Sequence, residues 1–282
     1  MSKSTVKNLP KSTVEIEIII PWDEIKSTYD TVFEEIAKET EVPGFRKGKA
    51  PKNLLEKKLD KTKIYEEVIK RIVPKAYQEA ISINNLKPVT SPKIEVLKAK
   101  ENEDWLIKAT LALKPKINLK NYKEKIREFK KSKIKIWTPG QDEKKEEEKK
   151  PSLDELLKVL LDSVEIELSD LLIQEEANRL LAQLIDQTQK LGLTVEQYLM
   201  AKGKTTEQIR AEYAQAARTN LTTEFVLAEI ADSEKIVVTD EDFNKILAKI
   251  EKPEEREKIK KDSYYLAHLI RQQKTLDFLN SL

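Results

Sequence analysis

The stretch from Val42 to Pro51 holds the residues best suited to contact a partner. It reads Val-Pro-Gly-Phe-Arg-Lys-Gly-Lys-Ala-Pro and contains two of the five glycines of the chain. Glycine admits positive φ and leaves backbone amides uncovered, while the bracketing prolines limit the freedom that the loop would lose on binding. Phe45 offers an aromatic anchor, and Arg46 offers a planar fork for phosphate or carboxylate. The loop therefore either docks on a surface that carries phosphate and an apolar pocket, or it is a surface turn whose Phe45 folds back onto the core.

The phosphate-binding loop of a nucleotide hydrolase is a different motif. It has the spacing Gly-x-x-x-x-Gly-Lys-Ser/Thr and follows a strand. Here only three residues separate Gly44 from Gly48, Ala50 replaces the hydroxyl residue, and a predicted helix precedes the loop. We therefore expect no nucleotide hydrolysis and no cofactor.

The composition leaves little room for enzyme chemistry. The chain has no cysteine and a single histidine, His268. The first fact excludes disulfides, zinc-thiolate sites and cysteine nucleophiles, and the second argues against a histidine metal site or a Ser-His-Asp triad. No pair of carboxylates stands out as acid and base. We expect no catalytic residue and no metal.

The loop lies within a predicted α+β domain that covers residues 1–113. Val14, Ile16, Ile18 and Ile20 alternate with outward positions, which predicts a strand. Apolar residues at spacings of three and four predict a helix over 23–39, and further helices follow from Pro51 and over 62–84. Alternation over 94–97 and 105–113 predicts a hairpin that pairs with the first strand. The result is a small antiparallel sheet with helices between its first and second strands.

The rear of the chain, residues 152–282, is predicted to be all-α. It begins with the capping-box pattern Ser152-x-x-Glu155. Helices are expected at 152–162, 169–190, 194–201, 205–231, 239–250 and 254–280. Several have a wide apolar face, so either they pack on both sides or some apolar surface stays uncovered. Residues 114–151, basic at first and then a Lys/Glu block that ends at Pro151, are expected to form an extended linker.

Charge is distributed unevenly along the chain. The net charge is +2, but residues 1–126 hold 26 basic and 19 acidic residues, and the rest hold 26 and 31. A basic front half suggests that this part alone meets a polyanion. No apolar run approaches the roughly 20 residues that span a bilayer, and residues 1–10 lack the apolar stretch of a signal peptide. We expect a cytoplasmic, soluble protein without membrane contact.

Three stretches resemble the trigger factor family, the bacterial chaperones at the nascent-chain exit of the ribosome. Gly44 to Pro51 is similar to the ribosome-binding signature of the family, Val164 to Ile173 to the entry of its helical chaperone domain, and Glu224 to Phe243 to its arm region. The resemblance implies an α+β N-terminal ribosome-binding domain, followed by an all-α, multi-helix chaperone domain with arm-like extensions.

Carried onto this sequence, the family's ribosome contacts fall on the loop. Phe45, Arg46 and Lys47 would contact large-subunit protein and ribosomal RNA at the exit tunnel. Gly44 and Gly48 would shape the loop, and Lys49 would add steering charge. The resemblance further implies an ATP-independent chaperone that shields apolar segments of unfolded nascent polypeptides; whether the free protein forms a homodimer stays open. The client contacts that we expect are Leu180, Leu184, Tyr213, Phe225, Tyr264 and Leu269.

The sequence departs from the family in one respect. Members usually carry a prolyl isomerase domain of the FKBP type between the tail and the helical body, whereas the corresponding position here holds only residues 137–151. Such a stretch is too short for a fold with a core. We therefore expect a protein without peptidyl-prolyl isomerase activity, although a family-level label would claim it.

Two other classes remain as alternatives. An exported chaperone of the SurA type shares a helical body of this kind but would need a signal segment. An RNA-binding adaptor would use the basic front half directly, and it would be expected to place aromatic residues among the lysines of a strand face. The strand faces here hold Ile, Val, Leu and Trp instead.

Overall fold

The computed structural model describes residues 3–41, 45, 51, 54–55, 59–133, 151–248 and 263–282. The chain divides into two units, residues 1–114 and residues 115–282, and each unit has its own hydrophobic core. Of the loop from Val42 to Pro51, the structure describes Phe45 and Pro51.

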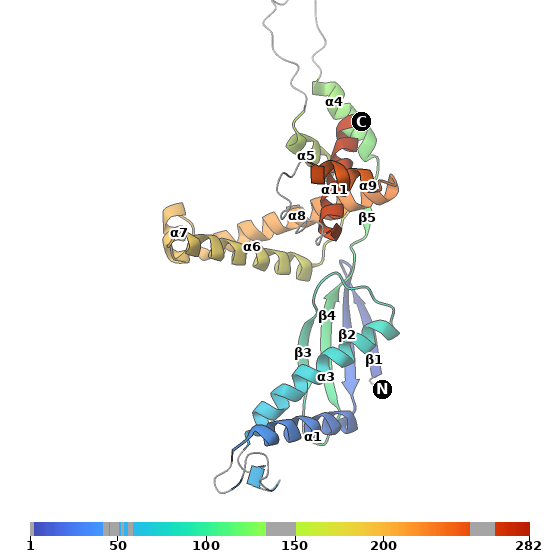
Figure 1. Cartoon of the computed structure of the whole chain (residues 1–282). Coiled ribbons are helices and arrows are strands. Elements are labelled where there is room, and N and C mark those ends of the chain that lie inside the picture. The colour runs from blue at the N-terminus through green and yellow to red at the C-terminus, as the bar shows by residue number, and fades with distance from the viewer. Residues whose placement is uncertain are drawn as a thin grey trace, which may run out of the picture. The chain divides into compact units, whose positions relative to one another are not determined.

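The front unit is built on a four-stranded antiparallel sheet (Figure 1). Its strands are β1 (Lys3–Leu9), β2 (Thr13–Ile20), β3 (Lys93–Lys98) and β4 (Trp105–Ala112), and their order across the sheet is β1-β2-β4-β3. The predicted first strand and the hairpin that pairs with it are confirmed as β2, β3 and β4. The additional strand β1 pairs along its whole length with β2.

Two helices, α1 (Trp22–Glu39) and α3 (Lys61–Ile83), cover one face of this sheet (Figure 1). The inward side chains of β2 and β4 are buried under them, because each strand is apolar at every second position. Trp105 is buried in this core, and its ring lies 5.9 Å from that of Tyr65 on α3. Pro74 lies within α3, which runs as one helix past it. The α+β prediction for the front of the chain is therefore confirmed.

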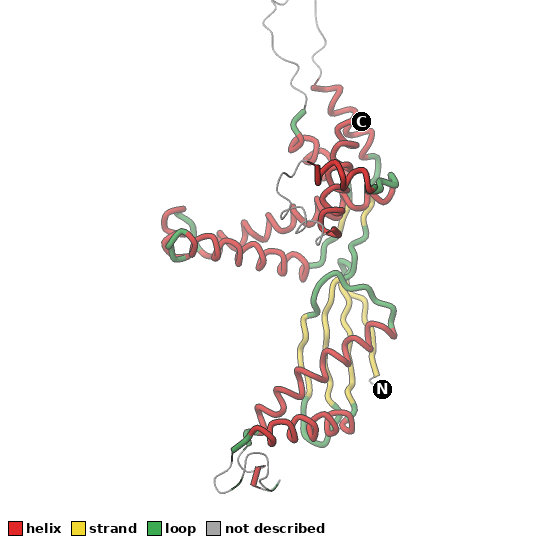
Figure 2. Tube along the Cα trace, in the orientation of Figure 1, coloured by secondary structure: helices red, strands yellow, loops and turns green. Residues whose placement is uncertain are grey.

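The rear unit is helical, as expected (Figure 2). Its helices are α4 (Tyr122–Lys133), α5 (Leu153–Ser163), α6 (Asp170–Lys190), α7 (Val195–Lys202), α8 (Thr206–Ser233), α9 (Asp240–Ala248) and α11 (Ser263–Ser281). A short pair of strands, β5 (Ile117–Asn118) and β6 (Glu165–Ile166), joins its beginning to the segment before α6. The first part of the helix predicted over 254–280 lies outside the described residues.

The prediction of an extended linker over 114–151 was wrong for its first half. Residues 122–133 form α4, and Tyr122 and Ile126 are buried in the core of the rear unit. The Tyr122 hydroxyl donates to Glu234 at 3.0 Å, and burial together with this carboxylate raises the pKa of Tyr122. Lys130 donates to the backbone carbonyls of Leu279 and Asn280 at the end of α11, at 3.1 and 2.6 Å. Residues 134–150, including Trp137, lie outside the described residues.

The rear unit has a body and an arm. The body consists of α4, α5, the second half of α8 and α11, which share one hydrophobic core. The arm consists of α6, α7 and the first half of α8; α6 and α8 run side by side, and α7 closes the hairpin at the end away from the body (Figure 1). The expectation of an arm-like extension is therefore confirmed, but the arm lies earlier in the chain than the resemblance placed it, because Val226, Leu227 and Ile230 belong to the core of the body.

The helix α8 belongs to both parts. Between its arm half and its body half lie Thr219, Thr222 and Thr223. Each of these hydroxyls donates to the carbonyl oxygen of the residue four positions earlier, at 3.1, 2.7 and 2.8 Å. Such bonds compete with the helical backbone ladder for the same carbonyl oxygens.

Candidate functional site

The predicted docking loop follows the helix α1 in the sequence of the front unit. The helix α1 ends at Glu39. On the other side of the loop, the Pro51 carbonyl oxygen accepts backbone hydrogen bonds from Leu54 and Leu55 at 3.0 and 3.2 Å. Leu55 is buried in the front core, which anchors this side of the loop. Phe45 is 44% exposed. This exposure favours a presented aromatic ring over one folded back onto the core. Gly44, Arg46, Lys47, Gly48 and Lys49 lie outside the described residues.

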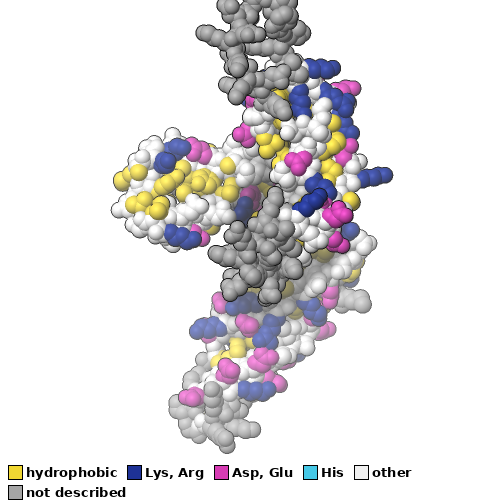
Figure 3. Space-filling view, turned by 45° about the horizontal axis from the view of Figure 1, so that its top comes forward, with side chains coloured by type: hydrophobic (Ala, Val, Ile, Leu, Met, Phe, Trp, Pro, Cys, Tyr) yellow, Lys and Arg dark blue, Asp and Glu magenta, His cyan; other side chains and the backbone are white. Residues whose placement is uncertain are grey.

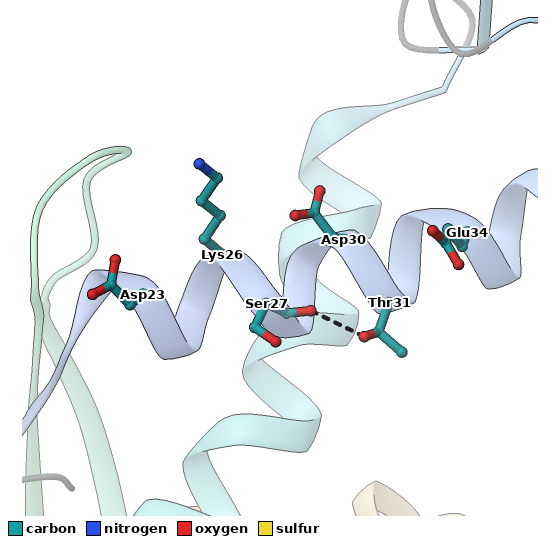
Figure 4. Close-up of a pocket in the computed structure, with 6 residues that line it drawn as sticks. All are labelled: Asp23, Lys26, Ser27, Asp30, Thr31 and Glu34. Atoms are coloured by element: carbon teal, nitrogen blue, oxygen red, sulfur yellow. Dashed lines mark hydrogen bonds between the residues drawn. The ribbon is translucent and has the colours of Figure 1, made fainter.

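The outer face of α1 offers no catalytic arrangement among the described residues. Figure 4 shows Asp23, Lys26, Asp30 and Glu34 spread along a shallow hollow of the helix, each pointing into solvent rather than toward one shared point. The hydrogen bond drawn there runs from the Thr31 hydroxyl to the Ser27 carbonyl oxygen at 3.0 Å, within the helix itself. Within the described ranges, no three His, Cys, Asp or Glu side chains come together as metal ligands.

The predicted client contacts differ in their exposure. Tyr264 is 90% exposed and Leu269 is also exposed, both on the first half of α11. Leu180, Tyr213 and Phe225 are half-buried. Leu184 is only 7% exposed. Its position on α6 faces the packing of the arm, so this side chain supports the arm and is not available on the surface.

Sequence reasoning missed a group of exposed apolar residues of the rear unit, which lie where the arm turns. Leu191 is 74% exposed and Met200 is 82% exposed, and the neighbouring Ile185 and Leu193 are exposed as well. We call these four residues the arm tip. Figure 3 shows hydrophobic side chains gathered on the surface of the arm. The signal was present in the sequence, because Leu191 and Leu193 flank a glycine between two predicted helices and have no helical stripe to join.

Backbone hydrogen bonds hold the arm tip in shape. At the end of α6, Gly192 has φ +72°, and Leu193 donates its backbone N–H to Thr188 at 3.0 Å. At the end of α7, Gly203 has φ +63°, and the Lys204 N–H donates to Leu199 at 3.1 Å. These are helix-ending turns that need a left-handed residue. Thr194 and Thr205 then begin α7 and α8 with complete capping boxes.

Ion pairs hold the segment after α8 against α11. Arg271 donates to Asp232 at 2.7 Å and to the Ile236 carbonyl oxygen at 2.9 Å. Lys274 donates to Asp242 at 2.7 Å, and this ammonium, with the backbone N–H of Thr239, lowers the pKa of Asp242 to about 2. These contacts fix α9 beside α11 and define the edge of the body.

None of the helices in the described ranges combines the length and the apolar character that crossing a bilayer requires. The candidate site of the chain is thus a pair of contact surfaces: an aromatic residue presented by the front unit, and an uncovered apolar arm tip on the rear unit.

Comparison with known proteins places the chain in a family. The family model described as bacterial trigger factor protein matches residues 2–149, and the model of the bacterial trigger factor C-terminus matches residues 125–280. The trigger factor of Mycolicibacterium smegmatis is 38% identical over 117 residues, which is 42% of this chain and 25% of that protein. The trigger factor of Pelotomaculum thermopropionicum is 34% identical over 122 residues, or 43% of this chain and 28% of that protein.

These matches with the curated relatives span about a quarter of each relative's length. A solved structure of the trigger factor chaperone, described for promiscuous substrate recognition in folding and assembly, has a TM-score of 0.66 over 99% of this chain and 99% of that chain, at 14% identity. At this identity the likeness establishes the fold of the chain.

Proposed function

Because the chain belongs to the trigger factor family, we propose that it is an ATP-independent chaperone that docks on the large ribosomal subunit and shields apolar segments of newly made polypeptides. The observation that carries the proposal is the arm tip, where Leu191 and Met200 stay exposed on a framework of capped helices. A soluble protein that only needed to fold would cover such side chains or replace them with polar ones. The family assignment speaks against the exported SurA-type alternative.

Ribosome docking is assigned to the front unit. The exposed ring of Phe45 would enter an apolar pocket of an exit-tunnel protein, and Arg46 and Lys47 would pair with phosphates of ribosomal RNA. Gly44, Gly48 and Lys49 complete the proposed contact. The cytoplasm is the compartment in which this docking takes place.

Client binding is assigned to the arm tip together with Tyr264, Leu269 and the half-buried Leu180, Tyr213 and Phe225. A contact of about 300 Å² of apolar surface gives on the order of 7 kcal/mol before association and ordering costs are subtracted. The remaining affinity is weak, so clients can leave without nucleotide hydrolysis. Apolar contact also discriminates weakly between sequences, which suits a chaperone that binds many different unfolded chains.

We further propose that the chain lacks prolyl isomerase activity. The N-terminal and C-terminal family models overlap at residues 125–149, so the two family domains follow each other without the length of a further domain between them. A refolding assay limited by proline isomerisation tests this directly. We expect the refolding rate with the protein to equal the uncatalysed rate, and a rate that rises with protein concentration would contradict the proposal.

A ribosome pelleting assay tests the docking. The triple variant Phe45→Ala, Arg46→Ala, Lys47→Ala should stay in the supernatant, while the unsubstituted chain pellets with ribosomes. The matched control is Ile83→Ala with Lys87→Ala, which also removes an exposed apolar group and a cation from the front unit. Undiminished pelleting of the triple variant would contradict docking through this loop. Loss of binding to naked RNA with retained ribosome binding would instead indicate the RNA adaptor.

A further inference from the structure

The sheet of the front unit has two edges of unlike character. The outer strands are β1 and β3, and no strand in the described ranges pairs with the outer side of either. On β1, the inward residues are Ser4, Val6 and Asn8, and Ser4 accepts a hydrogen bond from Asn84 at the end of α3 at 3.0 Å. The β1 edge is therefore largely polar and is contacted by the helix layer.

At the β3 edge, the rows of apolar side chains that form the core end in residues exposed to solvent. The strand register places Ile94 next to Ala109 and Val96 next to Ile107, in rows that start at buried residues of β2. Along each row the residues of β2 and β4 are buried, whereas Ile94 is 38% exposed and Val96 is 44% exposed. Each row of apolar side chains thus ends on β3 with a residue that is exposed to solvent, at an edge of the sheet that the helices do not cover.

We propose that β3 binds an extended, apolar segment of an unfolded polypeptide as an added strand. Main-chain groups of Lys93 to Val96 would pair with the segment, and its apolar side chains at every second position would lie beside Ile94 and Val96. Both rows of the core would then gain a fourth member. The proposal takes its ligand class from the proposed function, and it adds a peptide site on the front unit that shares no residue with the arm tip.

Charges at this edge favour an apolar partner over an acidic one. Glu95 pairs with Lys93 at 3.2 Å and with Lys108 at 2.6 Å, and Lys98 pairs with Glu103 at 2.5 Å. Because these lysines already have carboxylate partners within the β3–β4 hairpin, they add little attraction for an acidic peptide. The exposed apolar side chains and the main chain are what the edge offers.

The β3 edge also favours weak, short-lived binding of a peptide strand. A β-bulge interrupts the pairing of β3 with β4 between Val96 and Lys98, so the regular part of the edge covers only Lys93 to Val96. Bulges and lysines on an edge strand hinder continuous pairing with other chains. A short strand segment would thus be held weakly and released, while extended sheet formation between protein molecules is discouraged.

Binding of a labelled peptide to the full chain tests the proposal. The probe is a fluorescent peptide in which Val and Thr alternate, and its analogue is N-methylated on every residue, so that it keeps the side chains but has no amide donor. We expect the first to bind and the analogue to bind at least about fivefold more weakly, as the loss of strand pairing predicts. Hydrogen exchange of the amides of residues 93–97 should slow with the first peptide only.

The variant Val96→Lys should also weaken peptide binding about fivefold, because it places a charge in the apolar row. Ile83→Lys is the matched control, since Ile83 is an exposed apolar residue of the same unit outside the edge. Equal affinity of the two peptides, or unchanged binding by Val96→Lys, would overturn the proposal. The proposed chaperone function fails by a different result, the absence of aggregation suppression by the unsubstituted chain.

Discussion

The body and the arm of the rear unit use the same helix in opposite ways. In its body half, α8 contributes Val226, Leu227 and Ile230 to a core shared with α4, α5 and α11, and all three are buried. In its arm half, α8 packs mainly against α6, and the connecting α7 has no buried residue. A helix with one partner can hide one stripe of its surface. The contrast teaches that the exposure of the arm follows from having too few partner helices, and not from a lack of apolar residues.

The largest effect should come from a body residue. Ile230→Ala removes a fully buried side chain from the core between α8 and its neighbours, and it should lower the free energy of unfolding by about 3 kcal/mol. Denaturant titration followed by circular dichroism measures this. A change below about 1 kcal/mol would mean that the body relaxes around the cavity, and the contrast with the arm would weaken.

A smaller effect should follow from Gly203→Ala at the end of α7. A Cβ there would meet nothing within 4 Å, so the cost is conformational and comes from φ +63°. We expect a loss of about 1 kcal/mol for the helix turn. The control Gly203→Asn should be milder, because Asn tolerates the left-handed region better. Hydrogen exchange of α7 measures both, and equal exchange in the two variants would contradict the assigned role of the glycine.

Substitution of the arm tip should separate stability from function. The double variant Leu191→Ser, Met200→Ser removes exposed apolar groups, so the free energy of unfolding should change by less than about 0.5 kcal/mol. Suppression of aggregation of a denatured client should nevertheless fall severalfold. Light scattering during client dilution measures this. A variant that protects clients as well as the unsubstituted chain would show that the exposed arm tip is not a client surface.

The smallest effect should come from the ion pair between Asp242 and Lys274. The pKa of Asp242 is lowered to about 2, so its stabilising contribution is present above the ordinary carboxyl pKa near 4 and is lost as the pH falls toward about 2. Asp242→Asn should therefore lower the melting temperature slightly at neutral pH. At a pH below about 2 the difference between the two proteins should vanish. A difference that persists there would assign the effect to something other than the carboxylate charge.

Much of the fold could be predicted from local patterns. The strands β2 and β4 alternate strictly, and α5, α7 and α8 begin at Ser or Thr caps, so neighbouring residues determine their periodicity and their ends. β1 was missed because Val6 and Leu9 are its only apolar residues, and its turn into β2 uses Lys11 and Ser12 at positive φ in place of the usual Asn-Gly. Pairing with β2, which is not a local property, creates this strand.

The helix α4 was missed for a different reason. Its lysines and arginine dominate the composition of 122–133, and they hide a spacing of four and three between Tyr122, Ile126 and Phe129. That spacing is a helical stripe, and the stripe packs into the body core. The linker prediction gave average charge more weight than the positions of the few apolar residues.

The candidate site was predicted only in part. Composition and motif pointed to Phe45, and the ring is exposed. Leu184 was chosen from a broad apolar face, but a face shared with α8 buries it. Leu191 and Leu193 of the arm tip were overlooked, because residues in a connection between helices carry no periodicity that would mark them as surface or core.

The threonines between the two halves of α8 have a mechanical consequence. The helix α8 runs from the turn after α7 into the body as one continuous helix. A client bound at the arm tip therefore exerts its force on α8. Carbonyl oxygens shared with threonine hydroxyls weaken the backbone hydrogen bonds of the helix at residues 215–223. We expect bending of α8 to concentrate at these residues, so that the arm can move while the core of the body stays packed.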